Sequence, residues 1–290
     1  MPLLTTPLPL CIGDTVAVTA ASGQSNAEAL ARGVKMLESF GLRVQVMPSC
    51  HATHGTYLSG TDETRLQDLH AAFADPCIRG ILFARGGYGA ARLLPHLDYD
   101  LIVANPKIVV GYSDVTALHI VLNQRCNLAT YHGPMVASCL GSTQLRIATI
   151  KSLWDALFGN KRFLDQSRME IIHPGRATGL LVGGNLTVIA SLLGTPYEIN
   201  TRQRILFLEE VDEEPYRVDR LLLQLKLAGK FADAAGIAFG DFSPETLSTL
   251  KLAIDELVVP EKKPTIWGFP CGHVSPNYTL PLGQEVTLQV

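Results

Sequence analysis

The stretch from Lys107 to Leu118, Lys-Ile-Val-Val-Gly-Tyr-Ser-Asp-Val-Thr-Ala-Leu, decides how the first half of the chain folds. Its β-branched apolar run, Ile108–Val110, predicts a buried strand. Gly111 ends the run, and Ser113 and the aspartate after it are residue types that favour a helix N-terminus. Apolar residues then recur at helical spacing: Val115, Leu118, Val121 and Leu122. The pattern predicts a strand, a sharp turn and a helix, with a serine at the corner.

A serine at such a corner is a candidate nucleophile. It lies at the positive end of the helix dipole, beside backbone N–H groups that have no partner within the helix. Such groups can stabilise an oxyanion, and the turn resembles the nucleophile elbow of serine hydrolases. The Gly-x-Ser-x-Gly form of that motif is absent at Ser113. An ordinary helix N-cap serine is therefore the alternative interpretation.

The segments before this stretch alternate between the periods of strands and helices. Residues 14–20 and 42–46 predict strands, and the segment between them, 27–40, carries apolar residues at helical spacing and ends at a glycine. A helix over 61–75 and a strand over 80–84 follow. This alternation predicts a doubly wound, parallel α/β sheet.

The loop Arg85-Gly-Gly-Tyr-Gly89 follows the strand that we expect over 80–84. Its glycines allow close backbone approach and present N–H groups to an anion. The Gly-x-Gly-x-x-Gly spacing of a dinucleotide site is missing. Because ligands bind at the carboxyl ends of parallel strands, the loop is a candidate donor loop beside Ser113. A tight strand-to-helix turn without function is the alternative.

The second half of the chain predicts a smaller, mixed α/β domain with a β-rich end. We expect an N-terminal nucleophile domain over 1–160, a linker over 161–176 and a C-terminal domain over 177–290. A strand runs into a Gly-Gly-Asn turn over 179–185, and another strand, 204–208, exits into an acidic stretch. The last residues, 280–290, predict a β-hairpin turned at a glycine.

The composition excludes several classes of function. The chain has 290 residues, of which 47% are hydrophobic and 18% charged, as in globular proteins with an ample core. A net charge of −3 gives no electrostatic reason to expect nucleic acid or a membrane as partner. The N-terminus has no signal-peptide pattern, so we expect a cytoplasmic protein. The six cysteines are scattered and predict neither a disulfide framework nor a metal site.

A nucleophilic serine needs a general base, and the base needs an orienting group. Among the eight histidines, His273 lies in a Gly/Pro-rich loop after the strand expected over 265–267, and His132 follows a strand near the serine. Both are candidate bases. Glu209 is the candidate orienting carboxylate because a buried strand delivers it, although a solvated acidic surface is an alternative for the residues after it.

Five motifs, in this order, resemble the LD-carboxypeptidase family, which includes muropeptide L,D-carboxypeptidases and microcin C immunity peptidases. The matching segments are Arg-Gly-Gly-Tyr-Gly at Arg85–Gly89, Gly-Tyr-Ser-Asp at Gly111–Asp114, Gly-Gly-Asn at Gly183–Asn185, Leu-Glu-Glu with Pro-Tyr-Arg-Val-Asp-Arg within Leu208–Arg220, and Gly-His at Gly272–His273. The resemblance implies a triad of Ser113, Glu209 and His273. Glu210 stands where aspartate is common in the family, which leaves open the acid that orients the histidine.

The resemblance implies a serine peptidase without a cofactor or metal that releases terminal D-Ala from murein tetrapeptides during cell-wall recycling, usually as a homodimer. An oxyanion would bind the backbone N–H groups of Asp114, Gly86 and Gly87. Residues that we expect to contact the small peptide substrate are Arg85, Tyr88, Asn185 and Arg217. A peptidase that cleaves aminoacyl-nucleotide amides is one alternative, and a non-catalytic small-ligand binding protein is another.

Overall fold

The computed structural model describes residues 4–160 and 169–290, which form two compact units. The N-terminal unit comprises residues 4–160 together with Ser275–Pro281, and the C-terminal unit comprises residues 169–274 together with Leu282–Val290. The expected linker, 161–176, lies outside the described residues over 161–168, and its remainder contains strand β6, Glu170–His173. Among the residues described, no helix is both long and apolar enough to cross a membrane.

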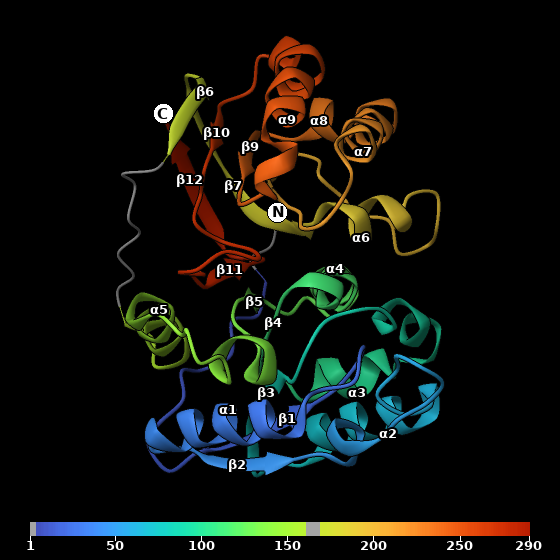
Figure 1. The fold of residues 1–290 in the computed structure, drawn as a ribbon, viewed down its shortest axis with the longest axis vertical. Helices are drawn as coiled ribbons and strands as arrows, with labels where there is room; N and C mark the ends of the chain where they lie inside the picture. Colours follow the sequence, from blue (N-terminus) through green and yellow to red (C-terminus); the bar gives the residue numbers. More distant parts are fainter. Residues whose placement is uncertain (1–3, 161–168) are drawn as a thin grey trace. The chain divides into compact units, whose positions relative to one another are not determined.

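The N-terminal unit is built on a six-stranded sheet of order β11-β5-β4-β3-β1-β2, in which β5, β4, β3, β1 and β2 run parallel (Figure 1). The strands are β1 Thr15–Thr19, β2 Arg43–Val46, β3 Ile78–Phe83, β4 Ile108–Gly111, β5 Thr130–His132 and β11 Leu280–Leu282. The helices are α1 Ala27–Ser39, α2 Asp62–Ala74, α3 Tyr99–Ala104, α4 Thr116–Arg125 and α5 Ile147–Leu157, with short helices η1 Pro48–His51, η2 Ala90–His96, η3 Ser113–Val115 and η4 Val136–Leu140.

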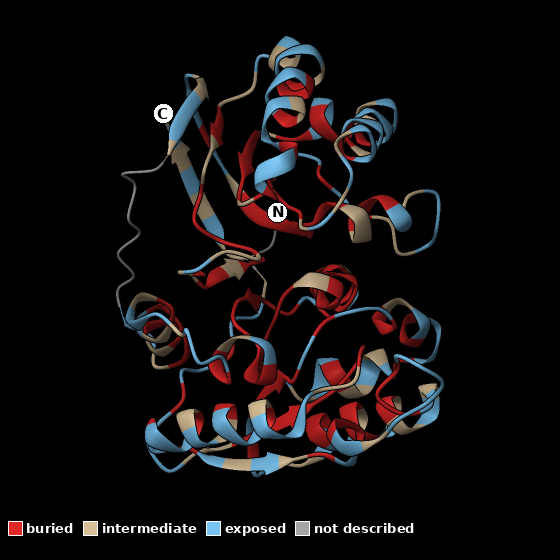
Figure 2. Ribbon diagram, viewed as in Figure 1, coloured by how far each residue is buried: buried red, intermediate tan, exposed pale blue. Residues whose placement is uncertain are grey.

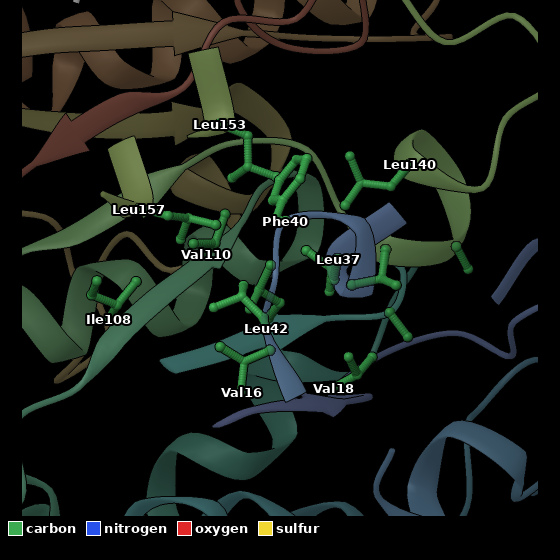
Figure 3. Close-up of a cluster of buried hydrophobic side chains, with 14 of the residues drawn as sticks. Val16, Val18, Leu37, Phe40, Leu42, Ile108, Val110, Leu140, Leu153 and Leu157 are labelled. Atoms are coloured by element: carbon green, nitrogen blue, oxygen red, sulfur yellow. The ribbon is translucent and has the colours of Figure 1, made fainter. Parts of the chain in front are cut away.

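Apolar side chains from α1, η4 and α5 form the core on one face of this sheet. Figure 3 shows Leu37 of α1, Leu140 of η4 and Leu153 of α5 directed towards Val16 and Val110 of the strands. All five side chains are at most 2% exposed. Burying each such side chain contributes about 1.5–3 kcal/mol. The predicted doubly wound parallel sheet is confirmed, and β4, the strand that precedes Ser113, packs into this core through Ile108 and Val110.

The C-terminal unit contains a second, mixed sheet of order β12-β7-β8-β9-β10-β6. Its central strands run parallel, whereas the two edge strands are antiparallel to their neighbours. The strands are β6 Glu170–His173, β7 Arg176–Asn185, β8 Ile205–Glu209, β9 Gly236–Phe239, β10 Thr265–Trp267 and β12 Glu285–Gln289. The helices are α6 Leu186–Ser191, α7 Pro215–Leu227, α8 Lys230–Asp233 and α9 Leu247–Ala253, with short helices η5 Pro244–Thr246, η6 Ile254–Val258 and η7 Val259–Glu261.

Burial follows the layered arrangement within each unit. Figure 2 shows the central strands buried, whereas the helices present exposed outer faces. All five residues of β8, Ile205–Glu209, are buried. A strand buried on both faces is apolar throughout, so the glutamate that ends β8 stands out.

Two local predictions were wrong. The β-hairpin expected over 280–290 does not form, because β11 belongs to the first sheet and β12 pairs with β7 in the second. The Gly-Gly-Asn segment is not a turn either. Gly183 and Gly184 continue β7 in register with β8, and Asn185 ends the strand and caps α6.

Candidate active site

Ser113 lies at a sharp corner where β4 ends and a helix begins. The residue before it, Tyr112, is extended, whereas Ser113 has a φ of 62°. This left-handed conformation costs a residue with a side chain about 1–2 kcal/mol. Helix η3 starts at the serine and continues into α4. The predicted strand, turn and helix are therefore present, with the backbone strain typical of a nucleophile elbow.

The glycine loop after β3 lies directly against the serine. A Cβ atom placed on Gly86 would lie 2.9 Å from both Cβ and Oγ of Ser113, so only glycine fits there. The next residue, Gly87, has a φ of 114°. Asp114 is 4% exposed, and its side chain is directed into the protein. Its backbone N–H therefore lies at the turn, beside Ser113. The structure thus brings together the backbone segments that were expected to donate to an oxyanion.

Glu209 and His273 form a hydrogen-bonded pair within the C-terminal unit. The Nδ1 atom of His273 lies 2.7 Å from Oε2 of Glu209. The Glu209 side chain is fully buried, whereas that of His273 is 19% exposed. Gly272 makes this approach possible, because a Cβ atom there would lie 2.7 Å from Oε2 of Glu209. A carboxylate at Nδ1 fixes the imidazole tautomer and directs Nε2 away from the glutamate.

The charge around His273 favours its protonated form. Burial lowers the pKa of His273, but the hydrogen bond and charge of Glu209 raise it, with further contributions from Glu210 and Asp212. The net result is a pKa above the ordinary value of 6.5. An imidazole that becomes a stabilised cation when it accepts a proton suits a general base.

Glu210 is directed elsewhere and holds the start of α6. One of its oxygens accepts a hydrogen bond from Nδ2 of Asn185 at 2.9 Å, and the other accepts from the backbone N–H of Thr187 at 2.7 Å. Burial raises the pKa of Glu210, and these hydrogen bonds oppose the effect. The alternative that the sequence left open, Glu210 as the partner of the histidine, therefore has no support from the geometry.

The expected substrate-contacting residues differ in their surroundings. Arg85 is exposed and donates to the backbone carbonyl of Gln24 at 2.8 Å. Tyr88 is 54% exposed, and its ring centroid lies 6.0 Å from that of Tyr57, which is also exposed. Asn185 is buried and caps α6 through Oδ1. Arg217 is exposed and forms an ion pair at 3.5 Å with Glu213, whose side chain is 20% exposed.

The other candidate base, His132, is placed in the interior. Its side chain is fully buried, and its ring packs edge-on against Tyr112 at 5.7 Å. His119 is also buried, its Nε2 lies 2.9 Å from the Gly111 carbonyl, and burial lowers its pKa to about 3. Both histidine rings are buried beside the end of β4, so they pack in the interior and cannot exchange protons with a substrate from there.

Sequence reasoning missed one segment of the site. Ser22 and Gly23, in the loop after β1, contact the serine's surroundings: the Gly23 N–H donates to the Gly86 carbonyl at 3.0 Å. The available signal was their place at the carboxyl end of a strand in a parallel sheet. Over residues 4–160 and 169–290, no three His, Cys, Asp or Glu side chains gather in a way that could hold a metal ion.

The chain is similar to known peptidases over most of its length. Residues 16–133 match the LD-carboxypeptidase N-terminal domain, and residues 178–288 match the LD-carboxypeptidase C-terminal domain. The chain is 39% identical over 285 residues to a probable murein peptide carboxypeptidase of Bacillus subtilis, covering 95% of this chain and 89% of the relative.

Two further relatives support the match. A murein tetrapeptide carboxypeptidase of Pseudomonas aeruginosa is 32% identical over 292 residues, covering 96% of this chain and 94% of the relative. The crystal structure of an MccF-like protein from Bacillus anthracis superposes with a TM-score of 0.88 at 30% identity, covering 99% of this chain and 96% of the other. The fold and the sequence therefore agree over nearly the whole length.

Proposed function

The chain belongs to the LD-carboxypeptidase family, and we propose that it is a serine carboxypeptidase that hydrolyses the L,D peptide bond of murein tetrapeptides and releases their terminal D-Ala. The observation that carries this proposal is the buried hydrogen bond between His273 and Glu209. A histidine oriented by a carboxylate is the general base that a serine nucleophile requires. Ser113 at its strained corner supplies that nucleophile.

In the proposed mechanism, Nε2 of His273 takes the proton from Ser113 as Oγ attacks the carbonyl carbon of the L,D bond. Glu209 holds the imidazole tautomer and stabilises the imidazolium that forms. The oxyanion of the tetrahedral intermediate binds backbone N–H groups of Asp114 and of Gly86 and Gly87. The intermediate collapses to an acyl-enzyme, and His273 gives its proton to the departing amine of D-Ala. A water molecule, deprotonated by the same imidazole, then hydrolyses the ester and restores Ser113.

Chain connectivity supports the pairing of His273 with Ser113. Thr279 packs against Gly133, whose N–H donates to the Gly111 carbonyl at 3.0 Å, two residues before the serine. Thr279 follows His273 by only six positions, and an extended chain of that length spans roughly 20 Å at most. The covalent chain therefore tethers the base to the segment that carries the nucleophile.

The leaving D-Ala ends in a carboxylate, so its recognition calls for a cation or a polar donor. We propose Arg85 and Arg217 as the cations, with Tyr88 and Asn185 as further substrate contacts. Both arginines are exposed, and neither is buried in a structural ion pair. A bidentate arginine–carboxylate pair would orient the substrate as well as bind it.

The remaining features rest on the sequence and on the family rather than on the geometry of the site. We propose a cytoplasmic homodimer that acts in cell-wall recycling and binds neither nucleic acid nor membrane. We also propose that residues 1–160 form the nucleophile domain and residues 177–290 the domain that supplies Glu209 and His273, joined by a linker over 161–176. The return of Ser275–Pro281 to the N-terminal unit is an addition to that division.

The direct test is release of D-Ala from purified murein tetrapeptide, followed by mass spectrometry. We expect release by the wild type and none by Ser113→Ala. Ser138→Ala, an exposed serine on η4, is the matched control and should behave as the wild type. Release by Ser113→Ala would show that the nucleophile is misassigned. No release by a folded wild type would refute the proposed substrate.

A second candidate function has one observation in its favour. A peptidase of aminoacyl-nucleotide amides needs an aromatic surface for the nucleobase. Trp154 is partly buried and packs between Phe40 and Phe158 against the core, so its ring faces are already covered. The exposed Tyr57 and Tyr88 provide such a surface. Cleavage of an aminoacyl-nucleotide amide in place of tetrapeptide would favour this function, whereas a non-catalytic binding protein would cleave neither.

A further inference from the structure

The sheet order of the N-terminal unit creates a topological switch point between β1 and β3. In the parallel order β5-β4-β3-β1-β2, the connections from these two neighbours leave in opposite directions along the sheet. Ligands of doubly wound proteins bind at the carboxyl ends of the strands at such a point. The loops after β1 and β3 meet there, and the turn at Ser113 follows the next strand, β4.

The carboxylate of Asp114 connects these loops through a single oxygen. Its Oδ2 accepts a hydrogen bond from Oγ of Ser22 at 2.6 Å and another from the backbone N–H of Ala90 at 2.8 Å. Ser22 is fully buried and Asp114 is 4% exposed. Hydrogen bonds to a buried carboxylate are short and strong, so both donors are held firmly.

Two further contacts complete a ring of connected residues that includes the nucleophile. The Gly23 N–H donates to the Gly86 carbonyl at 3.0 Å, and Gly86 lies directly against Oγ of Ser113. The ring runs from Ser113 to Asp114, through Ser22 to Gly23, and back through Gly86. The glycine loop is thus held at Gly86 by Gly23 and at Ala90 by Asp114.

A buried cation supports the same arrangement. The guanidinium of Arg65 is fully buried and donates to the backbone carbonyl of Ala21, the residue before Ser22. It also forms an ion pair with Asp62. Burial raises the pKa of Asp114, and the hydrogen bonds from Ser22 and Ala90, followed by the positive charge of Arg65, oppose that effect. Arg65 therefore fixes the loop after β1 and partly compensates the buried carboxylate.

We propose that the Asp114 side chain is a positioning residue that holds the Gly86–Ala90 loop at the distance from Ser113 that oxyanion binding requires. The role of its carboxylate is separate from the backbone N–H assigned to the oxyanion hole. This inference rests on the proposed function of Ser113 as nucleophile. Loss of an oxyanion donor lowers the rate of acyl transfer by about 10²–10³. If the loop is displaced, its N–H groups stabilise the oxyanion less well, and the reaction slows although every catalytic group is still present.

The test measures how fast Ser113 displaces fluoride from a fluorophosphonate probe, because this reaction uses the nucleophile and its oxyanion donors but no peptide. We expect Asp114→Ala to react about 10²-fold more slowly than the wild type. Ser22→Ala loses one of the two hydrogen bonds and should react up to about tenfold more slowly. Asp114→Asn keeps an oxygen that can accept both hydrogen bonds, so it should stay within about threefold of the wild type.

Ser49→Ala is the matched control. Ser49 is fully buried, and its Oγ accepts a hydrogen bond from the Ala20 N–H at 3.1 Å at the end of the same strand, β1, without contact to Asp114. It should react as the wild type does, with thermal unfolding recorded for every variant. With tetrapeptide, kcat of Ser22→Ala should fall while KM stays within about twofold.

Three results would overturn the proposal: a folded Asp114→Ala that reacts at the wild-type rate, an Asp114→Asn as slow as Asp114→Ala, or a Ser49→Ala as slow as Ser22→Ala. The first would show that the carboxylate is not needed, and the second that its charge matters rather than its geometry. A wild type that reacts with the probe but releases no D-Ala would refute the proposed substrate. The probe rates of the variants would still test the role of Asp114, because that reaction uses no peptide.

Discussion

Glu209→Gln should separate the electrostatic role of the buried carboxylate from its place in the packing. The substitution keeps the volume of the side chain but removes the charge that faces Nδ1 of His273 at 2.7 Å. A hydrogen bond to a charged group contributes about 1.5–3 kcal/mol. Because the hydrogen bond and charge of Glu209 raise the pKa of His273, that pKa should fall in Glu209→Gln.

The direction of the pH dependence follows from which form of the imidazole acts. His273 must be neutral to accept a proton, and its pKa in the folded protein is raised above 6.5. Activity of the wild type should therefore fall as the pH decreases through that raised pKa. In Glu209→Gln the acid limb should move to lower pH, while the rate at its plateau falls by about 10⁴, as for carboxylate-to-amide changes in other triads.

Two measurements check this prediction. The pH profile of kcat/KM gives the pKa in the free enzyme, and NMR titration of the His273 ring gives it without turnover. Glu214→Gln is the matched control, because Glu214 is an exposed member of the same acidic stretch. Its acid limb should stay within about 0.3 units of the wild type, as expected for a screened surface charge. An unshifted acid limb in a folded Glu209→Gln would refute the assignment of Glu209 as the group that sets the pKa of His273.

Three more substitutions test other parts of the site. In Glu210→Gln an amide nitrogen replaces one of the two accepting oxygens, so either the Thr187 N–H or the Asn185 side chain loses its acceptor. The free energy of unfolding, measured by thermal unfolding, should fall by about 1–3 kcal/mol. An unchanged melting curve would contradict the capping role. Gly86→Ala forces a methyl group against Ser113, so the rate of fluorophosphonate labelling should fall at least tenfold; labelling at the wild-type rate would show that the loop moves aside freely. Arg85→Ala should raise KM about tenfold with kcat nearly unchanged if this arginine binds the terminal carboxylate, whereas an unchanged KM for tetrapeptide would remove it from the substrate contacts.

Local patterns in the sequence determined the elements that bear the proposed catalytic groups. The run Ile108–Val110 followed by Gly111 and Ser113 predicted a strand, a turn and a helix, because apolar periodicity and capping depend on neighbours in the chain. The same reasoning predicted that Glu209 follows the end of a buried strand. Motif order across the chain then singled out His273, which composition alone left among eight histidines.

Tertiary structure decided what the acidic neighbours of the proposed catalytic residues do. Glu209 ends β8 and Glu210 follows it, and successive side chains of an extended chain point to opposite sides. One therefore meets His273, while the other meets the start of α6. Nothing in the sequence separates two adjacent glutamates, because the difference depends on which partner lies on each side.

Pairing between distant segments was also beyond the sequence. The pattern over 280–290 favours a hairpin because two strands flank Gly283, but β11 and β12 join different sheets. Likewise, the partners that Asp114 finds in Ser22 and Ala90 lie 92 and 24 residues away. The sequence by itself determined where β4 and β8 end and which chemical groups follow them. Only the tertiary structure decided which of those ends meet, because strand order and side-chain contacts arise from non-local packing.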